Sequence, residues 1–221
     1  MPTYFSEIGL MALLLPAVLT VVIAYALGCL NGAIITSKYI FKEDVRKHGS
    51  GNAGLTNFYR TYGTKGVVGV LAIDILKGVF AAAIGGMILG HFCGLPMIGK
   101  ILGMMFVLIG HMYPVTFGFR GGKGILTGVS AGLVVDWRVA LIAFSVFLVL
   151  AIITKYVSLG SVLSLAGYLA ALWYYYHDPV YEIMTAIPIC LMIYAHRSNI
   201  VRLIHGTENK FSFHRKDGAK K

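Results

Sequence analysis

The chain has 221 residues, of which 57% are hydrophobic and only 13% are charged, and its formal net charge is +10. A soluble domain has about 45–50% apolar and about 25% charged residues, so this composition excludes an ordinary soluble protein. Several apolar runs reach the roughly 20 residues that a helix needs to cross a bilayer. We therefore expect a single all-α, polytopic membrane domain over residues 1–221 and no nucleic-acid partner.

The apolar runs predict seven transmembrane helices. The expected ranges are 8–37, 66–90, 97–117, 123–135, 138–154, 158–176 and 179–195. The fourth is short for a full crossing, so a half-span is the alternative at that position. No Lys or Arg precedes the first run, and the basic region of a signal peptide is therefore missing.

The basic residues sort to one side of these helices. Only Lys100 and Arg138 fall in the opposite set of loops, whereas sixteen fall in one set of loops and the C-terminal tail: Lys38, Lys42, Arg46, Lys47, Arg60, Lys65, Arg120, Lys123, Lys155, Arg197, Arg202, Lys210, Arg215, Lys216, Lys220 and Lys221. Basic loops stay in the cytoplasm. We expect an outside N-terminus and a cytoplasmic C-terminus, an outcome that five crossings would also give. The tail at 205–221 is expected to be solvated and to contact anionic headgroups.

A first polar segment lies on the cytoplasmic side, in the loop at 38–65. It reads SGNAGLTN at 50–57 and is followed by Arg60. Thr56 or Asn57 is expected to cap a short helix that carries Arg60, and Gly63 is expected to end it. Taken alone, the segment also fits an ordinary loop between helices.

A second polar segment, FGFRGGKG at 117–124, directly precedes an apolar helix. Glycines let a backbone approach a ligand closely, and consecutive N–H groups at a helix N-terminus form an anion site. Arg120 and Lys123 add positive charge, so the segment suits a phosphate. It matches neither the P-loop nor the dinucleotide fingerprint. The alternative is a tight membrane turn with cytoplasmic positive charges.

A third polar segment, HRSNIVR at 196–202, closes the last apolar helix and is followed by Gly206 and Glu208. In a helix, His196 and Asn199 share a face. Arg197 and Arg202 fit the dipole of a helix C-terminus. A histidine with a pKa near neutrality at this place suits proton transfer.

Two smaller features also break the apolar pattern. Asp74 and Lys77 lie three residues apart inside an apolar helix, where a charge costs roughly 2.5–3.5 kcal/mol, which marks either a functional site or a structural ion pair. Ser158 and Ser161 begin another helix, and we expect Ser158 to cap it.

Several kinds of catalytic site are not supported. No histidine is followed five residues later by Asp, and no G-x-S-x-G elbow is present. Cys29, Cys93 and Cys190 are far apart and lack a neighbouring ligand, so we interpret them as packing residues.

Taken together, the three segments resemble the bacterial acyl-phosphate:glycerol-3-phosphate acyltransferase family. The similar stretches are SGNAGLTNFYR at 50–60, GHMYPVTFGFR at 110–120, GGKGILTG at 121–128 and HRSNIVRLIHGTE at 196–208, with DILKG at 74–78 and YVSLGS at 156–161. Leu55 and Leu126 stand where the family pattern has Ala. The resemblance covers nearly the whole chain in order.

The resemblance implies an enzyme that transfers a fatty acyl group from acyl phosphate to the 1-hydroxyl of sn-glycerol 3-phosphate. The products would be lysophosphatidate and phosphate, in the first acylation of bacterial phospholipid synthesis. It implies no cofactor and no metal, a bacterial plasma membrane location with the active site at the cytoplasmic face, and membrane lipid around the chain. A soluble enzyme that makes acyl phosphate would be the functional partner.

An acyl phosphate is already activated, so positioning and charge neutralisation suffice for catalysis. The expected catalytic residues are Ser50, Arg60, His196 and Asn199. The expected phosphate- and substrate-binding residues are Asn52, Gly121, Gly122, Lys123, Gly124 and Ser161. Expected supporting residues are Asp74, Lys77, Thr127 and Glu208. His196 either acts as the base or orients the acceptor while a substrate phosphate takes the proton. The rival functions are a small anion transporter and a structural membrane subunit.

Overall fold

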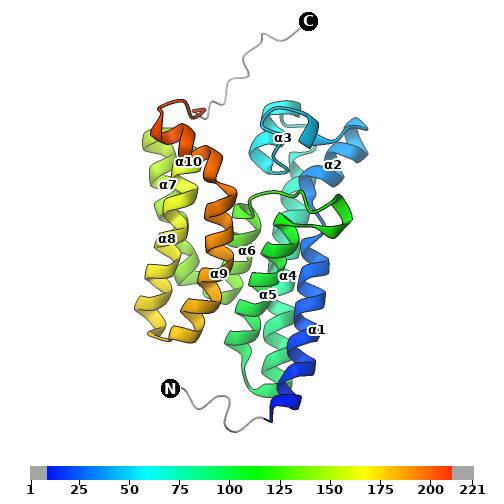
Figure 1. The fold of residues 1–221 in the computed structure, drawn as a ribbon, viewed down its shortest axis with the longest axis vertical. Helices are drawn as coiled ribbons and strands as arrows, with labels where there is room; N and C mark the ends of the chain where they lie inside the picture. Colours follow the sequence, from blue (N-terminus) through cyan, green and yellow to red (C-terminus); the bar gives the residue numbers. More distant parts are fainter. Residues whose placement is uncertain (1–8, 211–221) are drawn as a thin grey trace, which may run out of the picture.

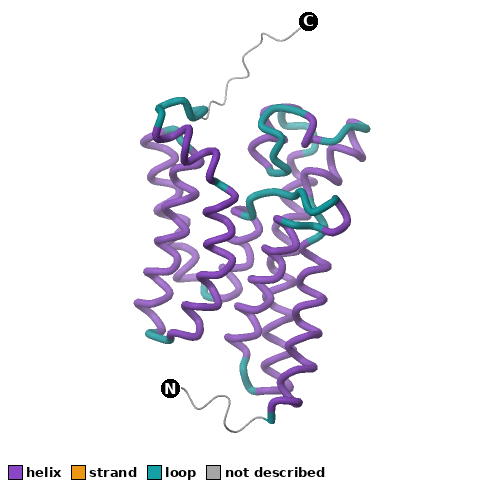
Figure 2. The backbone as a smooth tube through the Cα atoms, in the orientation of Figure 1, coloured by secondary structure: helices purple, strands orange, loops and turns teal. Residues whose placement is uncertain are grey.

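The computed structural model describes residues 9–210, and within this range all regular structure is helical (Figures 1 and 2). The tail at 211–221 lies outside the described residues, so the expected lipid contact of that part stays a prediction. The elements are α1 Leu10–Gly28, α2 Gly32–Phe41, η2 Val45–Lys47, α3 Leu55–Tyr62, α4 Val67–Cys93, α5 Pro96–Met112, η3 Val115–Phe117, α6 Ile125–Val135, α7 Trp137–Thr154, α8 Val157–Tyr176, α9 Pro179–Ala195 and α10 Arg197–Ile204.

The described residues contain five helical segments that are long and apolar enough to cross a membrane. A sixth is added if α9 and α10, which meet at a bend of 56°, form one broken span. The expected count of seven full crossings is not confirmed, because α6 has only 11 residues. At 1.5 Å per residue it is roughly 17 Å long, about half the thickness of a hydrocarbon core.

Three expected helix boundaries need correction. The run expected at 8–37 is two helices, because α1 ends at Gly28 and α2 starts at Gly32. Asn31 causes the restart: its side chain accepts a hydrogen bond from the Ile34 amide at 3.0 Å and so caps α2. The helix expected at 97–117 ends at Met112, and the one expected at 123–135 starts at Ile125.

Close backbone contacts unite α1, α4 and α5. A Cβ at Gly85 would meet the carbonyl of Gly99 across the α4–α5 interface, and a Cβ at Gly28 would meet Gly110 across the α1–α5 interface. In lipid, no hydrophobic force drives helices together, and their association depends on close van der Waals packing. Small residues such as these glycines allow that packing. These three helices therefore form one tightly packed bundle.

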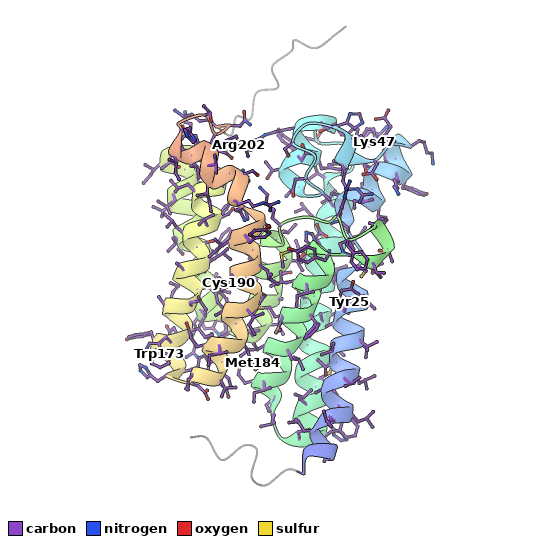
Figure 3. The ribbon with its side chains drawn as sticks, viewed as in Figure 1. Tyr25, Lys47, Trp173, Met184, Cys190 and Arg202 are labelled. Atoms are coloured by element: carbon purple, nitrogen blue, oxygen red, sulfur yellow. The ribbon has the colours of Figure 1, made fainter. Side chains whose placement is uncertain are left out.

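A second group of helices stands beside this bundle. Helices α7 and α8 pack along each other, α9 contacts α8 and α5, and α6 lies between the two groups (Figure 1). All loops with polar motifs gather at the end that carries α3 and α10, which we call the α3–α10 end (Figure 2). Lys47 and Arg202 lie there, whereas Trp173 and Met184 lie toward the opposite end (Figure 3).

The α3–α10 end has its own small core under the first polar loop. Ile34 of α2, Val45, Ala53 and Phe58 of α3 are all fully buried against one another. Burial of apolar side chains fixes a loop that has little regular structure. The first polar segment is therefore anchored to α2 and α4.

Candidate active site

One large open cavity occupies the α3–α10 end, with a volume of about 2190 Å³. The three polar segments that lie far apart in the sequence all contribute to its wall. Eleven of the fourteen expected site residues line it: Ser50, Asn52, Arg60, Asp74, Gly121, Lys123, Gly124, Ser161, His196, Asn199 and Glu208. Gly122, Lys77 and Thr127 lie behind this surface and are buried.

Asn57 organises the first polar loop, a role that sequence reasoning missed. Its side-chain oxygen accepts a hydrogen bond from the Ser50 amide at 2.9 Å. Its side-chain NH₂ donates to the carbonyls of Val45, His48 and Asn52 at 3.2, 3.0 and 3.1 Å. Asn57 thus holds both Ser50 and Asn52 at the cavity.

The expectation that Thr56 or Asn57 caps the short helix is wrong. Helix α3 begins at Leu55 after Gly54, which has no side chain to cap it, so both residues lie inside the first turn. The rest of that expectation is confirmed, because α3 carries Arg60 and ends before Gly63, whose φ is +72°. Glycine takes this left-handed conformation without strain.

Arg46 ties the first polar loop to the second polar segment at 117–124. Its guanidinium donates to the carbonyls of Phe117 and Arg120 at 2.7 and 2.9 Å and forms an ion pair with Asp44 at 2.7 Å. The hydrogen bond from Arg46 lowers the pKa of the Asp44 carboxyl below its ordinary value. In the sequence, Arg46 counted only as one of many basic residues.

The glycine loop at 121–124 packs directly on the end of α5. The amides of Gly121 and Gly122 donate to the carbonyls of Met112 and His111 at 3.0 and 3.2 Å. These two N–H groups are therefore already used, which corrects the expectation of an anion site built from consecutive free amides. The amides that remain for a ligand begin at Lys123, just before the N-terminus of α6.

The same packing explains the two adjacent glycines. A Cβ at Gly121 would clash with the carbonyl of His111, and one at Gly122 would clash with the His111 ring and the Ala53 carbonyl. Contact with α5 thus already requires glycine here, without any ligand.

Lys123 reaches across the cavity. Its ammonium donates to the side-chain oxygen of Asn199 on α10, so the glycine loop and the third polar segment are in contact. The pKa of Lys123 is lowered to about 8, mainly by burial. The carboxylate of Glu208 opposes this shift, and the charges of Arg202 and Arg60 add to it. Lys123, Arg60 and Arg202 thus outnumber the single carboxylate near them.

Glu208 connects α8 to α10. One carboxylate oxygen accepts from the Ser158 hydroxyl at 2.9 Å and from the Asn199 NH₂ at 2.7 Å, and the other accepts from Arg202 at 2.6 Å. Burial raises the pKa of Glu208, but the hydrogen bonds outweigh burial and hold it below its ordinary value. At neutral pH the carboxylate is ionised and fixes Asn199.

Ser158 does not cap α8, so that expectation is wrong. The N-cap is Tyr156, and the Ser158 hydroxyl is engaged by Glu208 instead. Ser161 lines the cavity, and its hydroxyl donates to the Val157 carbonyl one turn earlier, at 2.8 Å. The hydroxyl oxygen can still accept a hydrogen bond from a ligand.

His196 follows the last residue of α9 and is 3% exposed. Its Nδ1 lies 2.8 Å from the Met192 carbonyl, which can only accept, so Nδ1 carries the proton and Nε2 is the acceptor. The unprotonated Nε2 is therefore the ring atom that can accept a hydrogen bond from a ligand. The expectation of a pKa near neutrality stays a prediction.

Known proteins resemble this chain in both sequence and fold. A sequence model of the family described as glycerol-3-phosphate acyltransferase matches residues 18–206. A glycerol-3-phosphate acyltransferase of Thermoanaerobacter pseudethanolicus is 42% identical over 194 residues, which cover 88% of this chain and 95% of the relative. A glycerol-3-phosphate acyltransferase of Halalkalibacterium halodurans is 42% identical over 205 residues, which cover 87% of this chain and 94% of the relative. The chain belongs to the glycerol-3-phosphate acyltransferase family.

Solved structures of this family share the fold. The glycerol 3-phosphate form of PlsY, an integral membrane glycerol 3-phosphate acyltransferase, superposes with a TM-score of 0.79 at 35% identity and covers 89% of this chain and 96% of the other. Its lysophosphatidic acid form superposes with a TM-score of 0.77 at 34% identity, with the same coverage. The several apolar helices are those of an integral membrane acyltransferase.

A smaller, apolar cavity of about 50 Å³ adjoins the large cavity of this family member. The two cavities share the side chains of Ile125, Val129, Phe144 and Phe147. The polar site is thus continuous with a hydrocarbon-like surface between α6 and α7. Within residues 9–210, no group of three His, Cys, Asp or Glu side chains is placed to hold a metal ion.

Proposed function

We propose that this protein transfers a fatty acyl group from acyl phosphate to the 1-hydroxyl of sn-glycerol 3-phosphate and releases lysophosphatidate and phosphate. The observation that carries the proposal is the union of a cationic cavity with an apolar one. Both substrates carry a phosphate, and one carries a long acyl chain. Solved relatives in glycerol 3-phosphate and lysophosphatidic acid forms support the acceptor and the product.

The phosphates are bound by cations from three elements. Arg60 of α3, Lys123 of the glycine loop and Arg202 of α10 all border the large cavity. A guanidinium binds phosphate with two parallel hydrogen bonds, and an ammonium binds it as a point charge. Ser50, Asn52, Asn199 and Ser161 supply uncharged hydrogen bonds around these cations, and Gly124 brings the backbone close. The acyl chain extends along Phe144 and its neighbours.

The reaction needs no covalent enzyme intermediate. The oxygen of the 1-hydroxyl forms a bond to the carbonyl carbon of acyl phosphate, and the bond from that carbon to the phosphate oxygen breaks. Neutral His196 accepts the hydroxyl hydrogen bond at Nε2 and aligns the attack. A phosphate monoester has a second pKa of about 6, so a substrate phosphate can accept the hydroxyl proton near neutral pH. In this proposal the phosphate takes the proton and His196 orients the hydroxyl.

The active site is proposed to face the cytoplasm of the bacterial cell. Within residues 9–210, the basic residues outside the α-helices lie in loops at the α3–α10 end, and basic loops remain inside. In this orientation, a soluble enzyme that makes acyl phosphate can deliver the donor, and residues 1–221 act as one membrane domain. Labelling of a single cysteine at position 50 from outside intact cells would contradict the orientation.

Donor class is the feature to test first. Purified protein in a lipid mesophase is expected to release phosphate from palmitoyl phosphate only when glycerol 3-phosphate is present, and to form one lysophosphatidate per phosphate. Palmitoyl-CoA at the same concentration should give no product. Lys123→Ala should lower turnover, whereas Lys47→Ala, an exposed lysine outside the cavity wall, should not. Turnover with palmitoyl-CoA alone would overturn the proposed donor.

A further inference from the structure

A buried polar cluster lies behind the glycine loop, among groups that the proposed reaction does not use directly. It consists of Asp74 and Lys77 of α4 and His111 of α5, which are 2%, 2% and 3% exposed. Buried charges inside a membrane helix are costly and are retained where they pair or serve a site. The hydrogen bonds of the cluster determine which ring nitrogen of His111 carries the proton.

Lys77 uses all three of its N–H donors at short range. Its Nζ lies 2.7 Å from Asp74 Oδ1, 2.7 Å from the Leu30 carbonyl and 2.7 Å from His111 Nδ1. An ammonium has three donors and no acceptor, so His111 Nδ1 must be the acceptor in the third contact. The ring proton of His111 is therefore on Nε2. Asp74 is itself fixed by the amide of Gly32 at 3.1 Å.

The Nε2–H group of His111 has no acceptor among the described residues. His111 lines the large cavity, and its Nε2 lies against Gly122, where a Cβ would clash with it. Because this nitrogen is not fully enclosed by protein and His111 lines the cavity, its N–H is available to an acceptor inside the cavity. The amides of Gly121 and Gly122 are bonded to α5 and are not available to a ligand at that end of the glycine loop.

We propose that His111 is a further anion-binding residue of the site. Its Nε2–H donates to an oxygen of the phosphate group that is bound at the glycine loop, and the Asp74–Lys77 pair holds the ring in the tautomer that can donate. The inference rests on the proposed function, because it takes the glycine loop as a phosphate site. His111 binds the ligand directly, whereas Asp74 and Lys77 are positioning residues that act through it.

Two substitutions at position 111 separate binding from packing. In His111→Asn, the amide oxygen can still accept from Lys77 near the place of Nδ1, but no donor reaches the place of Nε2. In His111→Gln, the longer side chain brings an N–H to the place of Nε2. We expect the dissociation constant of glycerol 3-phosphate or inorganic phosphate, measured by calorimetry in detergent, to rise about tenfold to a hundredfold in the first variant. The second should recover most of the affinity.

Controls distinguish failure of this inference from failure of the proposed function. His91→Asn, in the exposed outer turn of α4, should bind phosphate like the unchanged protein. Lys123→Ala should weaken binding. If Lys123→Ala weakens binding and His111→Asn does not, the role of His111 is overturned while the site stands. If neither weakens binding, the glycine loop is not a phosphate site and both proposals fail.

A spectroscopic measurement covers the case in which the Asn variant does not fold. The histidine ¹⁵N spectrum of the unchanged protein, assigned with His111→Gln, should show an unprotonated Nδ1 and a protonated Nε2 for His111. Inorganic phosphate should shift the Nε2 signal. Lys77→Met should move the ring proton to Nδ1, which lies 3.6 Å from Asp74 Oδ1. A purely structural cluster predicts no response to phosphate. An Nε2 signal that does not move at saturating phosphate overturns the inference.

Discussion

The two walls of the cavity are built differently. The first wall, the loop at 44–66 with the glycine loop, is tied down by polar side chains such as the buried Asn57 and the half-buried Arg46. The second wall, the start of α8 with α10, is held by contacts that converge on Glu208. The first wall therefore keeps its shape through many independent bonds, whereas the polar contacts that align α10 with α8 in the second wall meet at one carboxylate. The comparison predicts stable packing on one side and easily lost alignment on the other.

The largest effect is expected from the buried pair behind the first wall. Lys77→Met leaves the Asp74 carboxylate buried without its cation, and breaking such a pair costs about 3–5 kcal/mol. The free energy of unfolding in detergent should fall by this amount. The double variant Asp74→Asn, Lys77→Met removes both charges and should recover most of the loss. Equal stability of Lys77→Met and the unchanged protein would show that the first wall does not depend on this pair.

The next effect concerns His196, which lies between the walls. His196→Ala should lower kcat about a hundredfold, because misplacement of a reacting group by about 1 Å costs that much. His196→Asn can still accept a hydrogen bond but cannot take a proton at neutral pH, and it should restore much of the rate. An Asn variant as slow as the Ala variant would make His196 the base. A fully active Ala variant would remove the residue from the mechanism.

A smaller effect should appear in the second wall. Glu208→Gln weakens the hydrogen bonds that fix Asn199, and the loss of one bond to a charged group corresponds to about a tenfold fall in kcat/KM. The melting temperature should stay close to that of the unchanged protein, since Arg202 is partly exposed. Ser158→Ala, which removes a single partner of Glu208, is the milder control. A large loss of stability in Glu208→Gln would erase the contrast between the walls.

The smallest expected effect is a pH dependence of KM that arises at Lys123, which joins the two walls through its contact with Asn199. The pKa of Lys123 is about 8, so its ammonium is charged below this pH and loses its charge above it. Phosphate monoesters are already fully ionised there, with a second pKa of about 6. The KM for glycerol 3-phosphate should rise by less than about tenfold between pH 7 and pH 9, since about tenfold is the factor by which the charged fraction of Lys123 falls. Lys123→Arg, which stays protonated, should abolish the rise. A flat KM in the unchanged protein would contradict the role of Lys123.

Much of the membrane architecture was predictable from the sequence because the bilayer imposes it. Long apolar runs must be helical in lipid, and the basic residues sort the polar segments to one end. That sorting brought Arg60, Lys123 and His196 to one cavity, as expected. Gly63 also ends α3 as expected, since a left-handed residue is needed there.

The rest depends on which groups the fold brings together. Asn57 has the sequence features of a helix cap, but its amide turns back to the loop carbonyls. The Glu208 carboxylate meets Ser158, 50 residues away in the chain. The glycine loop suggested free amides, but α5 uses two of them. Local patterns give the conformations that a segment can adopt, whereas these contacts between distant segments are set by tertiary packing.

The glycine contacts between α1, α4 and α5 have a consequence for biosynthesis. These helices come first in the chain and fit one another through their backbones, without help from α7, α8 or α9. Spans of this kind associate once they are in the membrane, and N-terminal parts fold first during synthesis. The first wall is thus expected to assemble on the ribosome before the second exists. Chains arrested after residue 135 should resist protease in detergent between 10 and 112, whereas chains arrested before 96 should not.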